Sequence, residues 1–212
     1  MNEKKRKGLM LVLSSPSGAG KTSICKKILK LDKEISMSIS YTTRSKRKSE
    51  KDGVDYFFVS KTDFDSLIRE KFFIEYANVF ENWYGTPKAF VEEKLENGKD
   101  VIFDIDWQGA QKLSDFSKND VVSIFILPPS NKELLKRLKK RAEDSVDIVS
   151  SRMSKAKAEI SHWIEYDYVL INDNLEICSS KIMNILKAER LKRKRQRFIF
   201  DFIDKLLDYF IR

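Results

Sequence analysis

The 212-residue chain contains very few of the residues that build metal clusters and disulfide frameworks. It has two cysteines, Cys25 and Cys178, and a single histidine, His162. Two isolated cysteines without C-x-x-C spacing exclude a disulfide scaffold and fit a reducing compartment, so we expect a cytoplasmic protein. One histidine excludes a zinc cluster and disfavours a Ser-His-Asp or Cys-His nucleophile. Any chemistry must therefore come from carboxylates, lysines, arginines or the backbone.

Long apolar runs are lacking as well. The longest, residues 9–13 and 121–129, are far shorter than the roughly 18 residues that a membrane span needs. The basic start leads into a glycine-rich loop without a small-residue cleavage site, so we expect neither a membrane segment nor a secretion signal. With 42% apolar and 34% charged residues, the chain is expected to form one soluble domain with inserted subdomains.

The net charge of +9 suggests a polyanion such as nucleic acid as a partner. The charge is unevenly distributed, however: residues 3–7 carry +3 and residues 187–197 carry +6, so the remaining residues are neutral in total. The basic stretch at residues 190–197 has no interleaved aromatic residues and no recognition motif. The distribution therefore disfavours nucleic acid as the main partner, although a side activity of the basic C-terminal segment stays open.

Apolar runs alternate with amphipathic stretches along most of the chain. This alternation predicts an α/β fold with a largely parallel sheet and helices on both faces. The expected buried strands are residues 9–13, 101–105, 121–127 and 168–171, and the expected helices are residues 22–31, 87–97 and 131–141. Ser130 and Glu133 form a capping box for the last of these helices.

Two segments depart from this alternation. Residues 35–80 contain short β-like pieces at 35–41, 56–59 and 72–80 and one helix near 63–70, which indicates an inserted β-rich subdomain over residues 35–90. Residues 1–34 and 91–212 would form the core, with a C-terminal helical segment at residues 176–212. From Ile199 onward that segment has one apolar face. We expect this face to pack on the chain's own core, with a dimer contact or membrane-surface docking as alternatives.

The strongest motif is a loop between the first expected strand and the first expected helix. It consists of Ser14, Ser15, Pro16, Ser17, Gly18, Ala19, Gly20, Lys21 and Thr22. Strand, loop and helix in this order are the context of a phosphate-binding loop, in which backbone N–H groups and the helix N-terminus hold phosphate oxygens. Lys21 would reach the transferring phosphates and Thr22 could bind Mg²⁺. Ser15 stands where the usual pattern has its first glycine.

A second anion-binding element follows in the β-rich segment. Arg44 and Arg47 lie three residues apart on an expected loop, with Ser40 before them and Tyr56 after them. Two guanidinium groups on one loop can hold an anion through planar bidentate contacts. Taken alone, such a loop is more often a solvated basic surface. The presence of a phosphate-binding loop in the same sequence favours the anion-binding interpretation.

Two further elements contribute carboxylates. Glu75 lies in an expected strand and is followed by Tyr84, Gly85 and Thr86. Asp104 and Asp106 stand at the C-terminal end of the strand at 101–105, the sheet edge at which open α/β folds bind ligands. We therefore expect Asp104 and Asp106 to face a bound ligand.

Together the four elements resemble the guanylate kinase family in order and spacing over residues 9–175. The pieces that carry this resemblance are S-x-T-T-R-x-x-R from Ser40, G-x-D-Y-x-F-V from Gly53, the glutamate followed by Y-G-T, and D-I-D-W-Q-G from Asp104. The resemblance implies a P-loop core, a GMP-binding subdomain at residues 35–90 and a helical lid at residues 137–152. It also implies Mg²⁺-dependent transfer of the γ-phosphate of ATP to GMP, in purine nucleotide metabolism.

The resemblance also implies roles for individual residues. Ser40, Arg44, Arg47 and Tyr56 would hold the GMP phosphate, Glu75 and Thr86 would read the guanine, and Tyr84, Asp104 and Asp106 would complete the GMP site. Lys21, Arg141 and Arg152 would act in catalysis. ATP would be bound by the phosphate-binding loop from Ser15 to Thr22, by Arg137 and by Asn172. Mg²⁺ would be held by Thr22, with Asp106 reaching it through water.

The guanine assignment agrees with hydrogen-bond chemistry. Guanine offers N1–H and its 2-amino group as adjacent donors, and an ionised Glu75 can accept both. Adenine would leave that carboxylate unpaired, which is costly in a site built for the hydrogen bond.

Some features leave other interpretations open. Ala142, Glu143 and Asp144 depart from the Gly and Thr that the family usually has after the position of Arg141. A catalytically inactive guanylate-kinase-like binding module is one alternative, disfavoured by the intact Lys21 and Thr22, and a kinase for another nucleoside monophosphate is a second, disfavoured by Glu75. The sequence allows a monomer or a homodimer.

Overall fold

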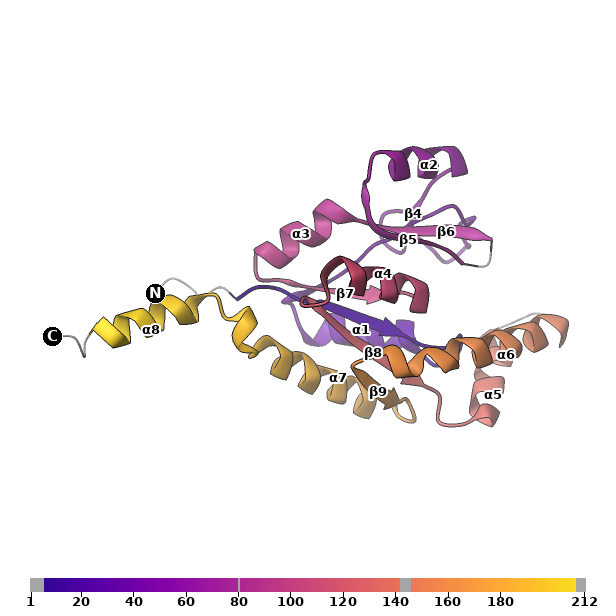
Figure 1. The fold of residues 1–212 in the computed structure, drawn as a ribbon. Helices are drawn as coiled ribbons and strands as arrows, with labels where there is room; N and C mark the ends of the chain where they lie inside the picture. Colours follow the sequence, from indigo (N-terminus) through magenta and orange to yellow (C-terminus); the bar gives the residue numbers. More distant parts are fainter. Residues whose placement is uncertain (1–5, 80, 142–145, 209–212) are drawn as a thin grey trace.

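A computed structural model describes residues 6–79, 81–141 and 146–208, with side-chain surroundings for all of these except residues 140–141 and 146–152. Two sheets organise the chain (Figure 1). The larger sheet has the order β2-β7-β1-β8-β9 and all its strands are parallel. Its strands are β1 (Met10–Ser14), β2 (Ile35–Met37), β7 (Asp100–Asp104), β8 (Val121–Leu127) and β9 (Tyr168–Ile171).

The smaller sheet is mixed and has the order β4-β3-β6-β5. Its strands are β3 (Tyr41–Thr42), β4 (Phe57–Phe58), β5 (Phe73–Val79) and β6 (Asn82–Pro87). The α-helices are α1 (Lys21–Leu31), α2 (Lys61–Arg69), α3 (Lys88–Glu96), α4 (Trp107–Ser117), α5 (Asn131–Arg141), α6 (Val146–Ser161), α7 (Leu175–Arg190) and α8 (Phe198–Asp208).

Side-chain alternation along β1 builds the core on both faces of the larger sheet. Leu9, Leu11 and Leu13 point to one face, where they share a buried cluster with residues of α1 and α7. Met10 and Val12 point to the other face, where they pack with residues of α3 and α4. A strand buried on both faces is typical of a parallel sheet with helices on either side, so the predicted α/β class is confirmed.

Most predicted elements of the core lie where the sequence indicated. The strands at 121–127 and 168–171 and the helix at 131–141 have the predicted bounds, and the other core elements differ by one or two residues. One expectation is wrong: Ile35–Met37, assigned to the inserted β-rich segment, pairs with β7 as the edge strand of the larger sheet. Strand β6 and helix α4 were not predicted, and α6 was expected only in part, within the helical lid at residues 137–152.

The C-terminal segment divides into two helices with different surroundings. Helix α7 buries Cys178, Ile182, Met183 and Leu186 in the core cluster beside α1. Helix α8 extends away from the body in Figure 1, and each of residues 200–208 is exposed. The expectation that the apolar face from Ile199 packs on the chain's own core is therefore wrong for α8 in the described part of the chain.

Candidate active site

The phosphate-binding loop connects β1 to α1 at the C-terminal edge of the larger sheet. Gly20 has a φ of 98° and is the N-cap residue of α1, a left-handed conformation that glycine adopts at little cost. Asn172, which is buried, donates from Nδ2 to the carbonyl of Ala19 over 2.7 Å. The loop is thereby anchored to the segment that follows β9.

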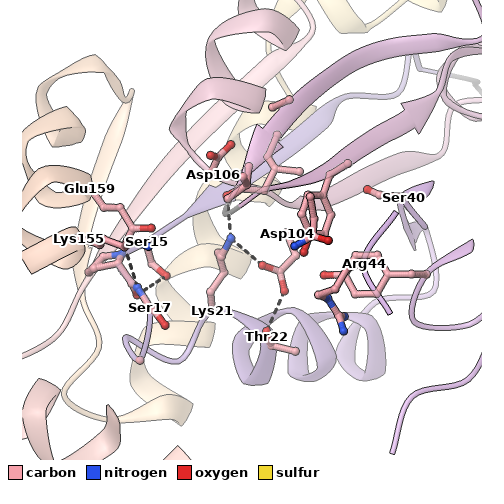
Figure 2. Close-up of a pocket in the computed structure, with 18 of the residues that line it drawn as sticks. Ser15, Ser17, Lys21, Thr22, Ser40, Arg44, Asp104, Asp106, Lys155 and Glu159 are labelled. Atoms are coloured by element: carbon pink, nitrogen blue, oxygen red, sulfur yellow. Dashed lines mark hydrogen bonds and ion pairs between the residues drawn. The ribbon is translucent and has the colours of Figure 1, made fainter. Parts of the chain in front are cut away.

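Lys21 and Thr22 both contact Asp104 at the end of the neighbouring strand β7, as Figure 2 shows. The Lys21 ammonium lies 2.7 Å from Asp104 Oδ1 and donates to the carbonyl of Ile105, also over 2.7 Å. The Thr22 hydroxyl donates to Asp104 Oδ2 over 2.9 Å. In this state the cation and hydroxyl that would serve phosphates are held by one carboxylate.

Asp106 has a structural role next to this cluster. It is the N-cap residue of α4, and its Oδ1 accepts the N–H of Gly109 over 3.0 Å. A carboxylate in this position satisfies a free N–H group of the first helical turn. Of the two predicted acids, Asp104 is therefore the one that contacts Thr22.

The predicted arginine pair is organised by an acid that the sequence analysis did not single out. Arg44 Nη2 donates to Glu50 Oε1 over 2.7 Å, and Glu50 Oε2 accepts the N–H of Arg47 over 2.8 Å. These contacts lower the pKa of Glu50 against the opposing effect of burial. The Arg44 guanidinium also lies 5.4 Å from the centre of the Tyr56 ring. Burial raises the pKa of Tyr56 to about 12, so its hydroxyl keeps its proton.

Glu75 is a buried carboxyl at the junction between the two sheets. It lies in β5 opposite Thr86 of β6, and its Oε1 accepts from the Thr86 hydroxyl over 2.7 Å. Ser40 extends this series of hydrogen-bonding groups, because its hydroxyl lies 3.4 Å from the hydroxyl of Thr86. Burial raises the pKa of Glu75 to about 7, with Asp106 adding to the increase and Thr86 opposing it. A side chain on Gly109 would crowd Glu75, so glycine there keeps room for the carboxyl.

All these groups meet in one cleft of about 1000 Å³ between the two sheets and the helices α5 and α6. Its lining includes most of the predicted site residues: Ser15, Pro16, Ser17, Gly18, Gly20, Lys21, Thr22, Ser40, Arg44, Arg47, Tyr56, Glu75, Tyr84, Asp104, Asp106 and Arg137. Ala19, Thr86 and Asn172 lie directly behind this lining, where they hydrogen-bond to each other or to lining residues.

The predicted lid is only partly described. Arg137 of α5 donates to the carbonyls of Ala19 and Asn172 over 3.4 and 3.3 Å, which places it beside the phosphate-binding loop. Arg141 and Arg152 lie on α5 and α6, but their side chains are outside the described residues, as are Ala142, Glu143 and Asp144.

Two charged residues of the cleft lining were missed from the sequence, Lys155 and Glu159 of α6. Glu159 Oε2 accepts the N–H of Ser17 in the phosphate-binding loop over 3.1 Å, and Figure 2 shows both α6 side chains beside that loop. Burial raises the pKa of Glu159. Residues 152, 155 and 159 share one face of a helix, so the spacing from Arg152 could have indicated both.

The cleft holds two anion-binding elements that face each other across one space. A phosphate-binding loop with Lys21 lies on one side, and Arg44 and Arg47 with the buried carboxyl of Glu75 lie on the other. This fold and site define a P-loop kinase that acts on a nucleotide.

Comparison with known proteins identifies the family. The guanylate kinase family model matches residues 7–189, and the chain belongs to this family. It is 52% identical over 202 residues to guanylate kinases of Novosphingobium aromaticivorans and Zymomonas mobilis, covering 95% of this chain and 91% and 94% of those proteins. A crystal structure of guanylate kinase from Anaplasma phagocytophilum superposes with a TM-score of 0.80 at 39% identity, covering 95% of this chain and 96% of that one.

Proposed function

We propose that this member of the guanylate kinase family transfers the γ-phosphoryl group of ATP to GMP, giving ADP and GDP. The observation that carries the proposal is the buried Glu75 carboxyl, which is 4% exposed and lines the same cleft as the phosphate-binding loop. A buried acid hydrogen-bonded on one side by Thr86 keeps acceptor capacity for a ligand on the other.

Guanine recognition would use Glu75 and Thr86. The ionised carboxylate accepts hydrogen bonds from guanine N1–H and from the 2-amino group. These two hydrogen bonds replace those that water would make to an exposed carboxylate. Adenine presents an acceptor at N1 and has no 2-amino group, so it leaves the carboxylate without a donor. The pairing of β5 with β6 fixes the positions of both side chains before a ligand binds. The selection of guanine over adenine would therefore rest on a preformed site.

The acceptor phosphate would bind to Ser40, Arg44, Arg47 and Tyr56. Its oxygens are already ionised near neutral pH, so the site needs positioning and positive charge and no general base. Arg44 is oriented by Glu50 and by the Tyr56 ring, whereas the Arg47 side chain is 59% exposed and can turn toward a ligand. Tyr84 lies against Tyr56, with ring centres 5.8 Å apart, and would border the same phosphate.

The donor phosphates would bind along the loop from Ser15 to Thr22. Lys21 would leave Asp104 for the β- and γ-phosphates, with Arg141 and Arg152 of the lid adding charge and Arg137 and Asn172 supporting the nucleotide from α5 and the segment after β9. The Thr22 hydroxyl and the Asp104 carboxylate are hard oxygen donors of the kind that Mg²⁺ binds together with water and phosphate. When bound there, Mg²⁺ neutralises charge on the phosphates.

The proposal also includes the cellular compartment and the residue ranges of the GMP-binding subdomain and the lid. Cys25 and Cys178 are both buried free thiols, which supports a reducing compartment, and we place the reaction in the cytoplasm. No helix in the described ranges is long and apolar enough to cross a membrane. Of the predicted GMP-binding subdomain at residues 35–90 we retain residues 38–90, because β2 belongs to the larger sheet, and we retain residues 137–152 as the lid that closes over ATP.

An ATP-dependent phosphorylation assay across GMP, AMP, UMP and dTMP tests the function, with Mg²⁺ omitted as a control. We expect GMP to be phosphorylated and the other three to react more slowly by several orders of magnitude. If AMP, UMP or dTMP were phosphorylated faster than GMP, the proposal that GMP is the substrate would be wrong. Nucleotide binding without turnover of any of the four would instead indicate an inactive binding module.

A further inference from the structure

Two carboxylates contact the phosphate-binding loop, one near each of its ends. Asp104 of β7 accepts from the Thr22 hydroxyl and pairs with Lys21. Glu159 of α6 contacts the earlier part of the loop, where its Oε2 accepts the N–H of Ser17 over 3.1 Å. In Figure 2 Lys21 lies between these two acids. Groups that would bind the donor phosphates are therefore held by the chain's own anions.

The N–H of Ser17 is a group for which Glu159 and a phosphate would compete. Backbone N–H groups of a loop that leads into a helix bind phosphate oxygens, and a carboxylate oxygen can take the same place. Burial raises the pKa of the Glu159 carboxyl, with Asp106 adding to the increase, whereas Lys21 and Lys155 favour its ionised form. In a partly buried cleft two anions a few ångströms apart repel each other more than they would in water. A phosphate at Ser17 would therefore require Glu159 to move away.

Glu159 lies on the helix that carries part of the predicted lid. Residues 152, 155 and 159 share one face of α6, with Glu159 beside the loop and Lys155 one turn nearer the start of the helix. The charge on this face therefore changes from negative beside the loop to positive toward the lid. A phosphate bound at Ser17 would repel one end of the face and attract the other.

We propose that Glu159 competes with the donor phosphates for the phosphate-binding loop and thereby sets the affinity for ATP. A triphosphate makes enough contacts with Lys21 and the rest of the loop to displace the carboxylate. A single inorganic phosphate makes fewer contacts, so the same competition leaves it with little net affinity. Glu159 is in this sense a specificity-determining residue. The inference rests on the proposed function, which places ATP on this loop.

Glu159→Gln tests the competition, because it removes the charge and keeps an oxygen that can accept the N–H of Ser17. Calorimetric titration of the full chain with ATP, without GMP and at constant Mg²⁺, measures the affinity without turnover. We expect the Kd for ATP to fall by about three- to thirtyfold, the range for one charge at a helix N-terminus, and the Kd for inorganic phosphate to fall as well. The Kd for GMP should not change, because Glu159 contacts the loop and not the arginine pair.

Glu34→Gln is the matched control, because it changes the net charge by the same amount. Glu34 pairs with Lys99 on the exposed surface just before β2, whereas the loop lies at the opposite edge of the larger sheet. Its Kd for ATP should equal that of the wild type, and an equal decrease in both variants would overturn the proposal. Unchanged or weaker ATP binding by Glu159→Gln would also overturn it and would show that the carboxylate supports the loop. Absence of ATP binding by both the wild type and Glu159→Gln would instead overturn the proposed function, and this inference with it.

Discussion

At the scale of single residues, Glu75 combines a stability cost with a functional demand. Burial raises the pKa of its carboxyl from 4.5 to about 7, yet reading guanine requires the ionised form. The ionised fraction falls as the pH decreases through this range. We therefore expect the KM for GMP to rise below about pH 7, by up to about tenfold per pH unit, while the KM for ATP changes little. Steady-state kinetics from acid to neutral pH measure both constants.

Glu75→Gln is the control for this pH dependence. The GMP phosphate also titrates in acid, and the variant keeps that titration while it loses the carboxyl. It should lose roughly 10²- to 10⁴-fold in kcat/KM for GMP and flatten the dependence that Glu75 causes. The same pH profile in both proteins would assign the dependence to the substrate and not to Glu75.

The stability of Glu75→Gln has a definite sign. A carboxyl whose pKa is higher in the folded state costs stability increasingly as the pH rises from 4.5 to about 7, and the full cost applies above that range. Removing the charge should therefore raise the free energy of unfolding above pH 7, by up to about 3 kcal/mol. An increase of this sign would also show that the variant loses activity without losing its fold.

At the scale of elements, the end of β7 and the start of α4 divide two roles between Asp104 and Asp106. Asp106→Ala removes the N-cap of α4 and should lower the free energy of unfolding by about 1 kcal/mol, whereas Asp106→Asn keeps an accepting oxygen and should preserve stability. Asp104→Asn, beside Thr22, should raise the Mg²⁺ concentration for half-maximal activity by about tenfold or more. Urea unfolding and Mg²⁺ titration of activity measure these effects.

The comparison between the two aspartates decides which acid serves the metal. If Asp106→Asn raised the Mg²⁺ requirement more than Asp104→Asn, the water-mediated role first expected for Asp106 would hold. The Asp104 arrangement would then belong only to the state without nucleotide.

Local pattern explains which elements could be predicted from the sequence. The phosphate-binding loop, the core strands and α5 have strong local signals of turn residues and apolar periodicity, and they lie where they were expected. Strand β6 was not predicted because it contains Gly85 and Pro87, which are unusual in strands, and it depends on pairing with β3 and β5. The sequence of Ile35–Met37 is compatible with a strand in either sheet. Its long-range pairing with β7 determines that it belongs to the larger sheet.

The site shows the same distinction between local and long-range information. Residues within motifs, such as Lys21 and Arg44, could be named in advance. The contact of Lys21 with Asp104 depends on how separate segments come together, whereas Glu50 holds Arg44 from the same loop and its role depends on the conformation of that loop. The use of Asp106 as a helix cap and of Asn172 as an anchor for the loop likewise required the three-dimensional structure.

At the scale of the whole molecule, the two ends of the larger sheet carry different ionic groups. The C-terminal ends of β1 and β7 carry the cleft, whereas Asp100, at the N-terminal end of β7, is fully buried between two arginines. Arg6 donates to both its carboxylate oxygens over 2.6 and 2.8 Å, and Arg190 of α7 donates to Oδ2 over 2.7 Å. Asp100 thus joins the N-terminal segment, the sheet and α7.

Removing this central carboxylate should destabilise the protein without altering its chemistry. Asp100→Ala leaves two guanidinium groups without their buried partner, so the free energy of unfolding in urea should fall by about 3–5 kcal/mol. Glu96→Ala is the matched control, because Glu96 makes a similar two-bond pair with Arg197, over 2.8 and 2.9 Å, on the exposed surface, and its loss should hardly change stability. At a temperature where both variants are folded, the KM values for GMP and ATP should equal those of the wild type. A large change in either KM for Asp100→Ala would show that the two ends of the sheet are coupled.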